Sequence, residues 1–228
     1  MTRDEHPHHD HAHDHAADGD RGYTGDFDEM AKTWDEDPTK VERAQVVAQR
    51  LVERLAPTPQ TRLFEYGAGT GLVAQHLQAH VGPVTLADTS QGMRDAMADK
   101  IASGALPSSA RVWSVDLATE PTPDERFDLV VTVQVLHHVH DLAAVLVAFA
   151  AITAPGGHLC IVDLEEEDGS FHGDGFGGHH GFRRSELAAQ LEAAGFSDIT
   201  FEHAYDLTKD GHEYPLFLAV CTSAATTP

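Results

Sequence analysis

Basic residues and long apolar runs, which bind nucleic acids and membranes, are scarce in this sequence. Lys and Arg number 15 against 37 Asp and Glu, which gives a formal net charge of −22 at pH 7. Such a chain repels nucleic acids and anionic membrane surfaces, so we expect neither as a partner. The longest strongly apolar run, residues 142–154, falls short of the roughly 20 residues that cross a bilayer. The N-terminus also has no apolar signal core, which favours a cytoplasmic protein.

Cysteine is almost absent as well. The two thiols, Cys160 and Cys221, each lie inside an apolar run that is typical of a strand. We expect buried, inert thiols rather than a disulfide or a nucleophile. With 228 residues and 41% hydrophobic content, the chain is long enough to bury the core of one ordinary domain.

The first 22 residues contain no large apolar side chain after Met1, so they cannot bury enough surface to fold. Six of the 17 histidines lie in this segment, interleaved with acidic residues: His6, His8, His9, His11, His13 and His15. We expect a disordered tail at 1–22 that binds transition metals loosely. A dedicated metal store or sensor is the alternative. The domain then occupies 23–228, with an N-terminal helical cap at about 23–58, and no pattern indicates its oligomeric state.

Helical and strand patterns alternate through the domain. Seven apolar segments predict strands: "RLFEYG", "PVTLAD", "ARVWSVD", "RFDLVVTVQVL", "HLCIVDLE", "ITFEHAYDL" and "YPLFLAVCT". Helical stripes separate most of them; Asp141 is placed to cap one such helix and Ser185 another. Strands of nearly continuous apolar character, alternating with helices, predict a mostly parallel sheet covered on both faces. The last two strands have no helix between them, which predicts one antiparallel strand.

Ligands of such sheets bind beyond the carboxyl ends of the strands. The first predicted strand ends in "EYGAGTG", residues 65–71, where glycine permits a tight turn and close approach to a ligand. A dinucleotide fingerprint would require glycine or alanine three residues after Gly69, where Leu72 stands. The spacing therefore argues against NAD.

The segment "LFEYGAGTG" resembles the first motif of class I S-adenosylmethionine-dependent methyltransferases. The resemblance continues in order through Asp88, Asp116, "FDLVVTVQVLHHV" and "APGGHLCIVD", over about residues 23–220. It is similar to the small-molecule members of methyltransferase type 11, the UbiE-like group. It implies a Rossmann-like, doubly wound α/β fold with a seven-stranded, mostly parallel sheet, and S-adenosyl-L-methionine as methyl donor.

The resemblance also implies a set of cofactor-binding residues: Glu65, Gly67, Gly69, Gly71, Asp88, Met93, Asp116, Leu117 and Gln134. Asp88, about twenty residues beyond the glycine loop, suits both ribose hydroxyls because a carboxylate accepts several hydrogen bonds. Asp116 with Leu117 is implied at the adenine edge, and Met93 on the adenine face. As alternatives, both aspartates are turn or cap residues and Met93 is a core residue.

Glu65 is implied near the methionine amino group, the glycine-loop amides near the methionine carboxylate, and Gln134 at the methyl-donor end. The alternative for Glu65 is a pair with a buried cation. His137 and His138 stand at a point where related sequences carry a histidine that packs structurally, and a catalytic role is the alternative. Trp34 in the cap either closes over the cofactor or packs.

The glycine- and histidine-rich stretch "FHGDGFGGHHGF", residues 171–182, leaves the carboxyl end of the fifth predicted strand. We expect a mobile lid in which His172, His179 or His180 contacts the acceptor and serves as the base. Loop packing and a metal site are the alternatives, and no metal ligands are assigned.

The sequence thus favours methyl transfer to the O, N or C nucleophile of a small-molecule acceptor by in-line displacement. No Asn-Pro-Pro-aromatic tetrapeptide follows the fourth predicted strand, which by resemblance argues against the amino-methylating nucleic-acid enzymes. The alternatives are a protein methyltransferase, a member of the fold with other donor chemistry, and a metal-binding protein that uses the fold without catalysis.

Overall fold

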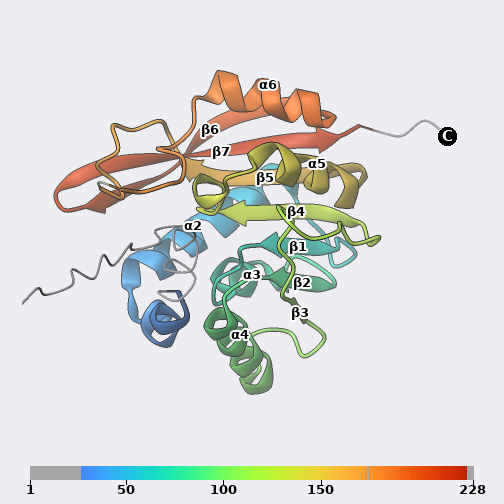
Figure 1. Ribbon diagram of the computed structural model, residues 1–228. Helices are drawn as coiled ribbons and strands as arrows, with labels where there is room; N and C mark the ends of the chain where they lie inside the picture. Colours follow the sequence, from blue (N-terminus) through green and yellow to red (C-terminus); the bar gives the residue numbers. More distant parts are fainter. Residues whose placement is uncertain (1–26, 174, 225–228) are drawn as a thin grey trace, which may run out of the picture.

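The computed structural model describes residues 27–173 and 175–224. The predicted tail at 1–22 lies outside this range. A seven-stranded sheet in the order β3-β2-β1-β4-β5-β7-β6 forms the centre of the fold (Figure 1). The strands are β1 Leu63–Tyr66, β2 Val84–Ala87, β3 Arg111–Trp113, β4 Phe127–Val133, β5 Thr153–Leu164, β6 Phe196–Lys209 and β7 His212–Ser223.

Strands β3, β2, β1, β4 and β5 pair in parallel, whereas β7 runs antiparallel to both β5 and β6. The predicted doubly wound sheet with one antiparallel strand is therefore confirmed. The order reverses between β1 and β4, so the carboxyl ends of these two strands flank the switch point at which open sheets bind ligands.

Helices cover both faces of the sheet, as Figure 1 shows. The helical elements are η1 Ala31–Glu36, α2 Pro38–Leu55, α3 Leu72–Leu77, α4 Gln91–Ser103, η2 Leu136–His138, α5 Leu142–Ile152 and α6 Arg184–Ala194. Helices α2, α3 and α4 pack on one face, and α5 and α6 pack on the other. Among these helices none has both the length and the apolar composition of a membrane span.

The alternation of side chains along each strand divides the core into two clusters. Leu63 belongs to the cluster under α2, α3 and α4, whereas its neighbour Phe64 belongs to the cluster under α5 and α6. Cys160 and Cys221 fall into different clusters, and both are buried and free. Burial raises the pKa of Cys221 to about 12 and raises the pKa of Cys160 as well. The prediction that both thiols are buried and form no disulfide is thus confirmed, and their raised pKa values favour the less reactive thiol form.

Several predicted boundaries were wrong. Strand β4 ends at Val133 rather than Leu136, β5 begins at Thr153 rather than His158, and β6 begins at Phe196 rather than Ile199. Strand β3 ends at Trp113 rather than at Asp116, because the chain turns at Asp116 and pairs no further with β2. Helix α6 begins at Arg184 with Arg183 as its N-terminal cap residue, so Ser185 lies inside the first turn. The predicted cap at Asp141 is confirmed, since its carboxylate accepts a hydrogen bond from the Ala144 amide at 3.0 Å.

Helix α5 offers a direct test of the core under it. The Phe149 side chain is fully buried and its ring lies 5.4 Å from the ring of Tyr66, while Val147 on the same helix is 59% exposed. We expect Phe149→Ala to lower the free energy of unfolding by about 3–5 kcal/mol, because a cavity replaces the ring. Val147→Ala is expected to change it by less than about 0.5 kcal/mol. Urea denaturation of both variants measures the difference; equal losses would contradict this packing.

Candidate functional site

The glycine loop between β1 and α3 is shaped by close contact with the segment after β4. Gly67, Gly69 and Gly71 have φ values of 65°, 56° and 78°, a region that glycine enters without strain. A Cβ atom on Gly67 would lie 2.3 Å from Cγ2 of Val135, so no other residue fits there. The loop therefore presents bare backbone at the switch point between β1 and β4.

Asp88 follows β2 and ties its end to the glycine loop. One carboxylate oxygen accepts a hydrogen bond from the Gly69 amide at 2.8 Å, and the other accepts from the Ser90 amide at 2.9 Å. Burial raises the pKa of Asp88, while these two amides oppose the shift. A carboxylate accepts about four hydrogen bonds, so acceptor capacity for about two further donors remains.

Glu65 lies within β1 and is buried, 3% exposed. Its carboxyl group accepts a hydrogen bond from the Ala74 amide of α3 at 3.0 Å. Burial raises the pKa of this carboxyl to about 8, although the Ala74 bond and the charge of Lys100 act in the opposite direction. No ion pair to Glu65 is found in the described part of the chain. The alternative of a pair with a buried cation is not what the structure shows.

The side chains of Met93 and Trp34 both lie close to Gly69. A Cβ atom built on Gly69 would lie 3.9 Å from the Met93 sulfur and 3.8 Å from Nε1 of Trp34. Met93 is buried at the start of α4, whereas Trp34 comes from η1 of the cap. Met93 and Trp34, which the sequence predicts near the cofactor, therefore both lie beside the glycine loop.

The cap is anchored to the domain by two aspartates that sequence reasoning missed. Asp28 accepts hydrogen bonds from the Ser90 hydroxyl at 2.5 Å and from the Gly92 amide at 2.9 Å. Asp35 accepts from the Thr70 hydroxyl at 2.5 Å and pairs with Lys100 at 2.5 Å. These contacts hold the cap over the glycine loop and the start of α4.

Asp116 and Leu117 lie beyond the end of β3, in a turn. The Asp116 carboxylate accepts hydrogen bonds from the Ala118 amide at 2.9 Å and from the Thr119 hydroxyl at 2.8 Å, and a third from the hydroxyl of Tyr66 at 3.3 Å. Leu117 is buried in the cluster under α5 and α6. Asp116 thus organises the turn and connects it to β1.

Gln134 follows β4 in a left-handed conformation, with a φ value of 54°, and its amide donates to the carbonyl of Val162 in β5 at 2.7 Å. A left-handed conformation is unusual for a non-glycine residue and redirects the chain here. The next turn, η2, carries His137 and His138. Gln134 therefore ends its strand beside the segment that contacts Gly67.

One histidine of η2, His137, contacts a buried carboxylate. Nδ1 of His137 lies 2.6 Å from Oδ1 of Asp163 in β5, and both side chains are almost wholly buried. Asp163 also accepts from the amide of Leu136 at 3.0 Å. Sequence reasoning did not select Asp163; an acidic residue inside the apolar run "LCIVDL" was the available signal.

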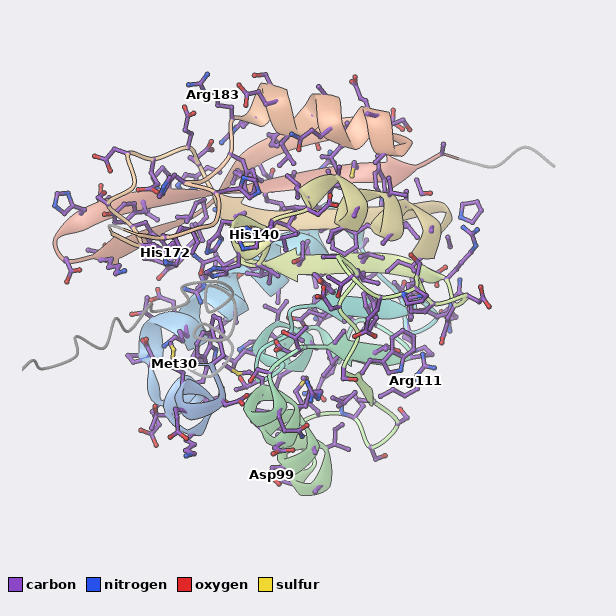
Figure 2. All side chains as sticks on the ribbon, in the orientation of Figure 1. Met30, Asp99, Arg111, His140, His172 and Arg183 are labelled. Atoms are coloured by element: carbon purple, nitrogen blue, oxygen red, sulfur yellow. The ribbon has the colours of Figure 1, made fainter. Side chains whose placement is uncertain are left out.

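The loop after β5 brings only one of its three candidate histidines to this place. The ring of His172 lies 5.1 Å from the rings of both His137 and His138, measured between centroids. Figure 2 shows His172 on this loop beside the segment that follows β4. Burial lowers the pKa of His138 to about 2 and that of His172 to about 4, so both rings are neutral at pH 7.

His179 and His180 have other partners. Nε2 of His179 lies 2.9 Å from the Val139 carbonyl, and its amide donates to the carbonyl of His137 at 2.7 Å. His180 is exposed, with Nδ1 3.2 Å from a carboxylate oxygen of Glu167. The loop is therefore fastened to η2 through His179, and the three predicted catalytic histidines do not form one group.

Comparison with known proteins identifies the family. A family model described as a methyltransferase domain matches residues 41–200. An uncharacterized methyltransferase of Schizosaccharomyces pombe is 32% identical over 119 residues, which cover 49% of this chain and 42% of that protein. The ubiquinone biosynthesis O-methyltransferase of Rhodopseudomonas palustris is 31% identical over 114 residues, which cover 48% of this chain and 42% of that protein. The chain thus spans less than half the length of these two relatives.

A solved structure shares the fold. The 1,6-didemethyltoxoflavin-N1-methyltransferase of Burkholderia thailandensis, with bound 1,6-didemethyltoxoflavin and S-adenosylhomocysteine, is 18% identical, with a TM-score of 0.68. The likeness covers 89% of this chain and 87% of that one. Together with the family model, which spans more than half of the residues, it confirms the resemblance drawn from the motifs. The chain belongs to the methyltransferase domain family, as a class I member.

Proposed function

We propose that this protein transfers a methyl group from S-adenosyl-L-methionine to a small-molecule acceptor. The observation that carries the proposal is the Asp88 carboxylate, which stands at the end of β2 and is joined to the bare backbone of Gly69. This pairing combines acceptors for a ribose diol with a loop that admits a ligand closely. Family membership and the toxoflavin methyltransferase likeness support the same activity.

The residues present fit the proposed cofactor. A Cβ atom on Gly69 would be in ordinary contact with both Met93 and Trp34, so these two side chains lie close enough to the loop to contact a ligand bound there. Glu65, Gly67, Gly71 and Gln134 would hold the amino-acid end, and Asp116 with Leu117 the adenine edge. When bound, S-adenosylmethionine supplies a methyl group on a positively charged sulfur. The chain's own part is to orient the reactants and, through the cap, to exclude water.

The identity of the acceptor atom, an O, N or C nucleophile, is a further part of the proposal. The catalytic roles of His172, His179 and His180 stay predictions, as do the protein acceptor and the alternative chemistries. The division into a tail at 1–22 and a domain at 23–228, the loose metal binding of the tail and the cytoplasmic location also stay predictions.

Cofactor binding tests the site. We expect Asp88→Ala to weaken the binding of S-adenosylhomocysteine by at least about 100-fold, because hydrogen bonds to a charged acceptor contribute about 1.5–3 kcal/mol each. Asp99→Ala is the matched control, since Asp99 is exposed on α4 (Figure 2). Titration calorimetry measures both affinities. A wild-type chain that binds neither S-adenosylmethionine nor S-adenosylhomocysteine would refute the function, and unchanged binding by Asp88→Ala would refute the site.

The buried Glu65 carboxyl predicts a dependence of stability on pH. Its pKa is about 8 in the folded chain and 4.5 as the ordinary value, so the folded state holds the proton more tightly. Its stabilising effect is complete below pH 4.5 and is lost as the pH rises through 8. Between pH 5 and pH 8 this lowers the free energy of unfolding by up to about 3 kcal/mol.

Glu65→Gln keeps the acceptor for Ala74 but cannot ionise. We expect this variant, without added cofactor, to lose less stability than the wild type between pH 5 and pH 8. Glu192→Gln, at an exposed position of α6, is expected to follow the wild type. Urea denaturation at several pH values measures the three slopes. Parallel slopes for wild type and Glu65→Gln would show that Glu65 is ionised in the folded chain throughout this range.

A further inference from the structure

One group of histidines meets the spacing of a metal site within residues 27–173 and 175–224. His137, His138 and His172 each offer a ring nitrogen, and these three atoms lie within 4.8 Å of one another. Ring centroids are 4.0 Å apart for His137 and His138, and 5.1 Å apart for each pair with His172. Three nitrogens around a tetrahedral zinc ion lie about 3.3 Å apart, so binding one ion requires these atoms to approach one another by at most about 1.5 Å.

Asp163 holds the His137 ring in an orientation that is common for histidine ligands of metal ions. The carboxylate of Asp163 accepts from the backbone amides of Leu136 and Leu164, at 3.0 and 2.8 Å, and is therefore fixed in place. Its Oδ1 atom lies 2.6 Å from Nδ1 of His137. A carboxylate is only an acceptor, so Nδ1 carries the hydrogen and Nε2 is the ring nitrogen that can bind a metal ion. A carboxylate–histidine pair of this kind commonly supports a metal ion.

The third nitrogen, that of His172, lies on the loop after β5, which is held against η2 at one point and has free space at another. The amide of His179 bonds to the carbonyl of His137, and a Cβ atom on Gly178 would lie 2.2 Å from that carbonyl. Next to His172, in contrast, a Cβ atom on Gly173 would meet nothing within 4 Å. The loop is thus held against η2 at Gly178 and His179, whereas the backbone next to His172 has space to change its conformation.

We propose that His137, His138 and His172 bind one divalent transition-metal ion of the zinc class. Three protein nitrogens leave the fourth tetrahedral position open, the arrangement of zinc ions that bind water or a substrate atom. The site lies in the turn after Gln134 and Val135, and Val135 contacts Gly67 of the loop. The open position then belongs to the acceptor side, a consequence that rests on the proposed methyltransferase function, whereas the metal site itself does not.

Cobalt(II) tests the site directly, because its visible absorption reports nitrogen ligands in tetrahedral geometry. The reference protein is the full chain with the six histidines of residues 1–22 replaced by glutamine, which removes their competing affinity. We expect it to bind one Co²⁺ with visible absorption that Zn²⁺ abolishes by displacement. His138→Ala and His172→Ala, each made in this chain, are expected to weaken Co²⁺ binding by more than about 10-fold, since even the loss of a supporting group has that effect.

His140→Ala is the matched control, because His140 is exposed two residues after His138 and lies outside the group (Figure 2). We expect its Co²⁺ affinity to equal that of the reference chain. The site would be overturned if the reference chain did not bind Co²⁺ stoichiometrically. It would also be overturned if His138→Ala and His172→Ala both kept full Co²⁺ affinity, or if His140→Ala lost as much affinity as they did. Circular dichroism verifies that each variant is folded, and two ligand variants keep the test valid if one is not.

Calorimetry with S-adenosylhomocysteine on the same reference chain separates the two proposals. Co²⁺ binding without S-adenosylhomocysteine binding would leave the metal site standing and remove the methyltransferase function. The reverse result would leave the function and remove the metal site.

Discussion

The parallel pairing of β1 with β4 determines where the other candidate site residues lie. Because the two strands run side by side with their connections on opposite sides, both carboxyl ends open at the same edge of the sheet. Gly67 continues from one strand and Val135 from near the end of the other, and they touch so closely that a Cβ atom on Gly67 is excluded. This contact brings the glycine loop against the segment that leads into η2, and Asp88 after β2 joins the same loop through the Gly69 amide.

Much of this arrangement follows from local sequence rules. Successive side chains of a strand point to opposite faces, which places Leu63 and Phe64 in different clusters. Strand ends identify Gly69 and Asp88 as neighbours. The rules fail where a tertiary contact ends an element early. The apolar pattern continues to Asp116, yet its carboxylate binds the following turn and the hydroxyl of Tyr66, so the strand stops sooner.

The histidine group shows a second limit. His137 and His138 are adjacent in sequence, but His172 comes from another loop, and no periodicity relates them. The sequence predicts His172, His179 and His180 as equivalent candidates, because all three lie in one stretch after the fifth predicted strand. In the fold, a loop that turns back on itself sends neighbouring side chains in different directions, so His179 contacts the Val139 carbonyl instead. How the loop packs on η2 decides that His172 joins His137 and His138, and no local sequence pattern encodes this packing.

Buried and half-buried carboxyl groups at this edge give the site its chemical character. Glu65, Asp88 and Asp163 all lie at or near strand ends, and none of the three forms an ion pair with Lys or Arg among the described residues. Amides and one imidazole form hydrogen bonds with them instead. Burial also raises the pKa of Glu65 to about 8, so this carboxyl group keeps its proton at neutral pH. Desolvation makes such groups costly in the free protein. A cationic ligand offsets that cost on binding, and a sulfonium, an amino group and a divalent metal ion all carry the required charge.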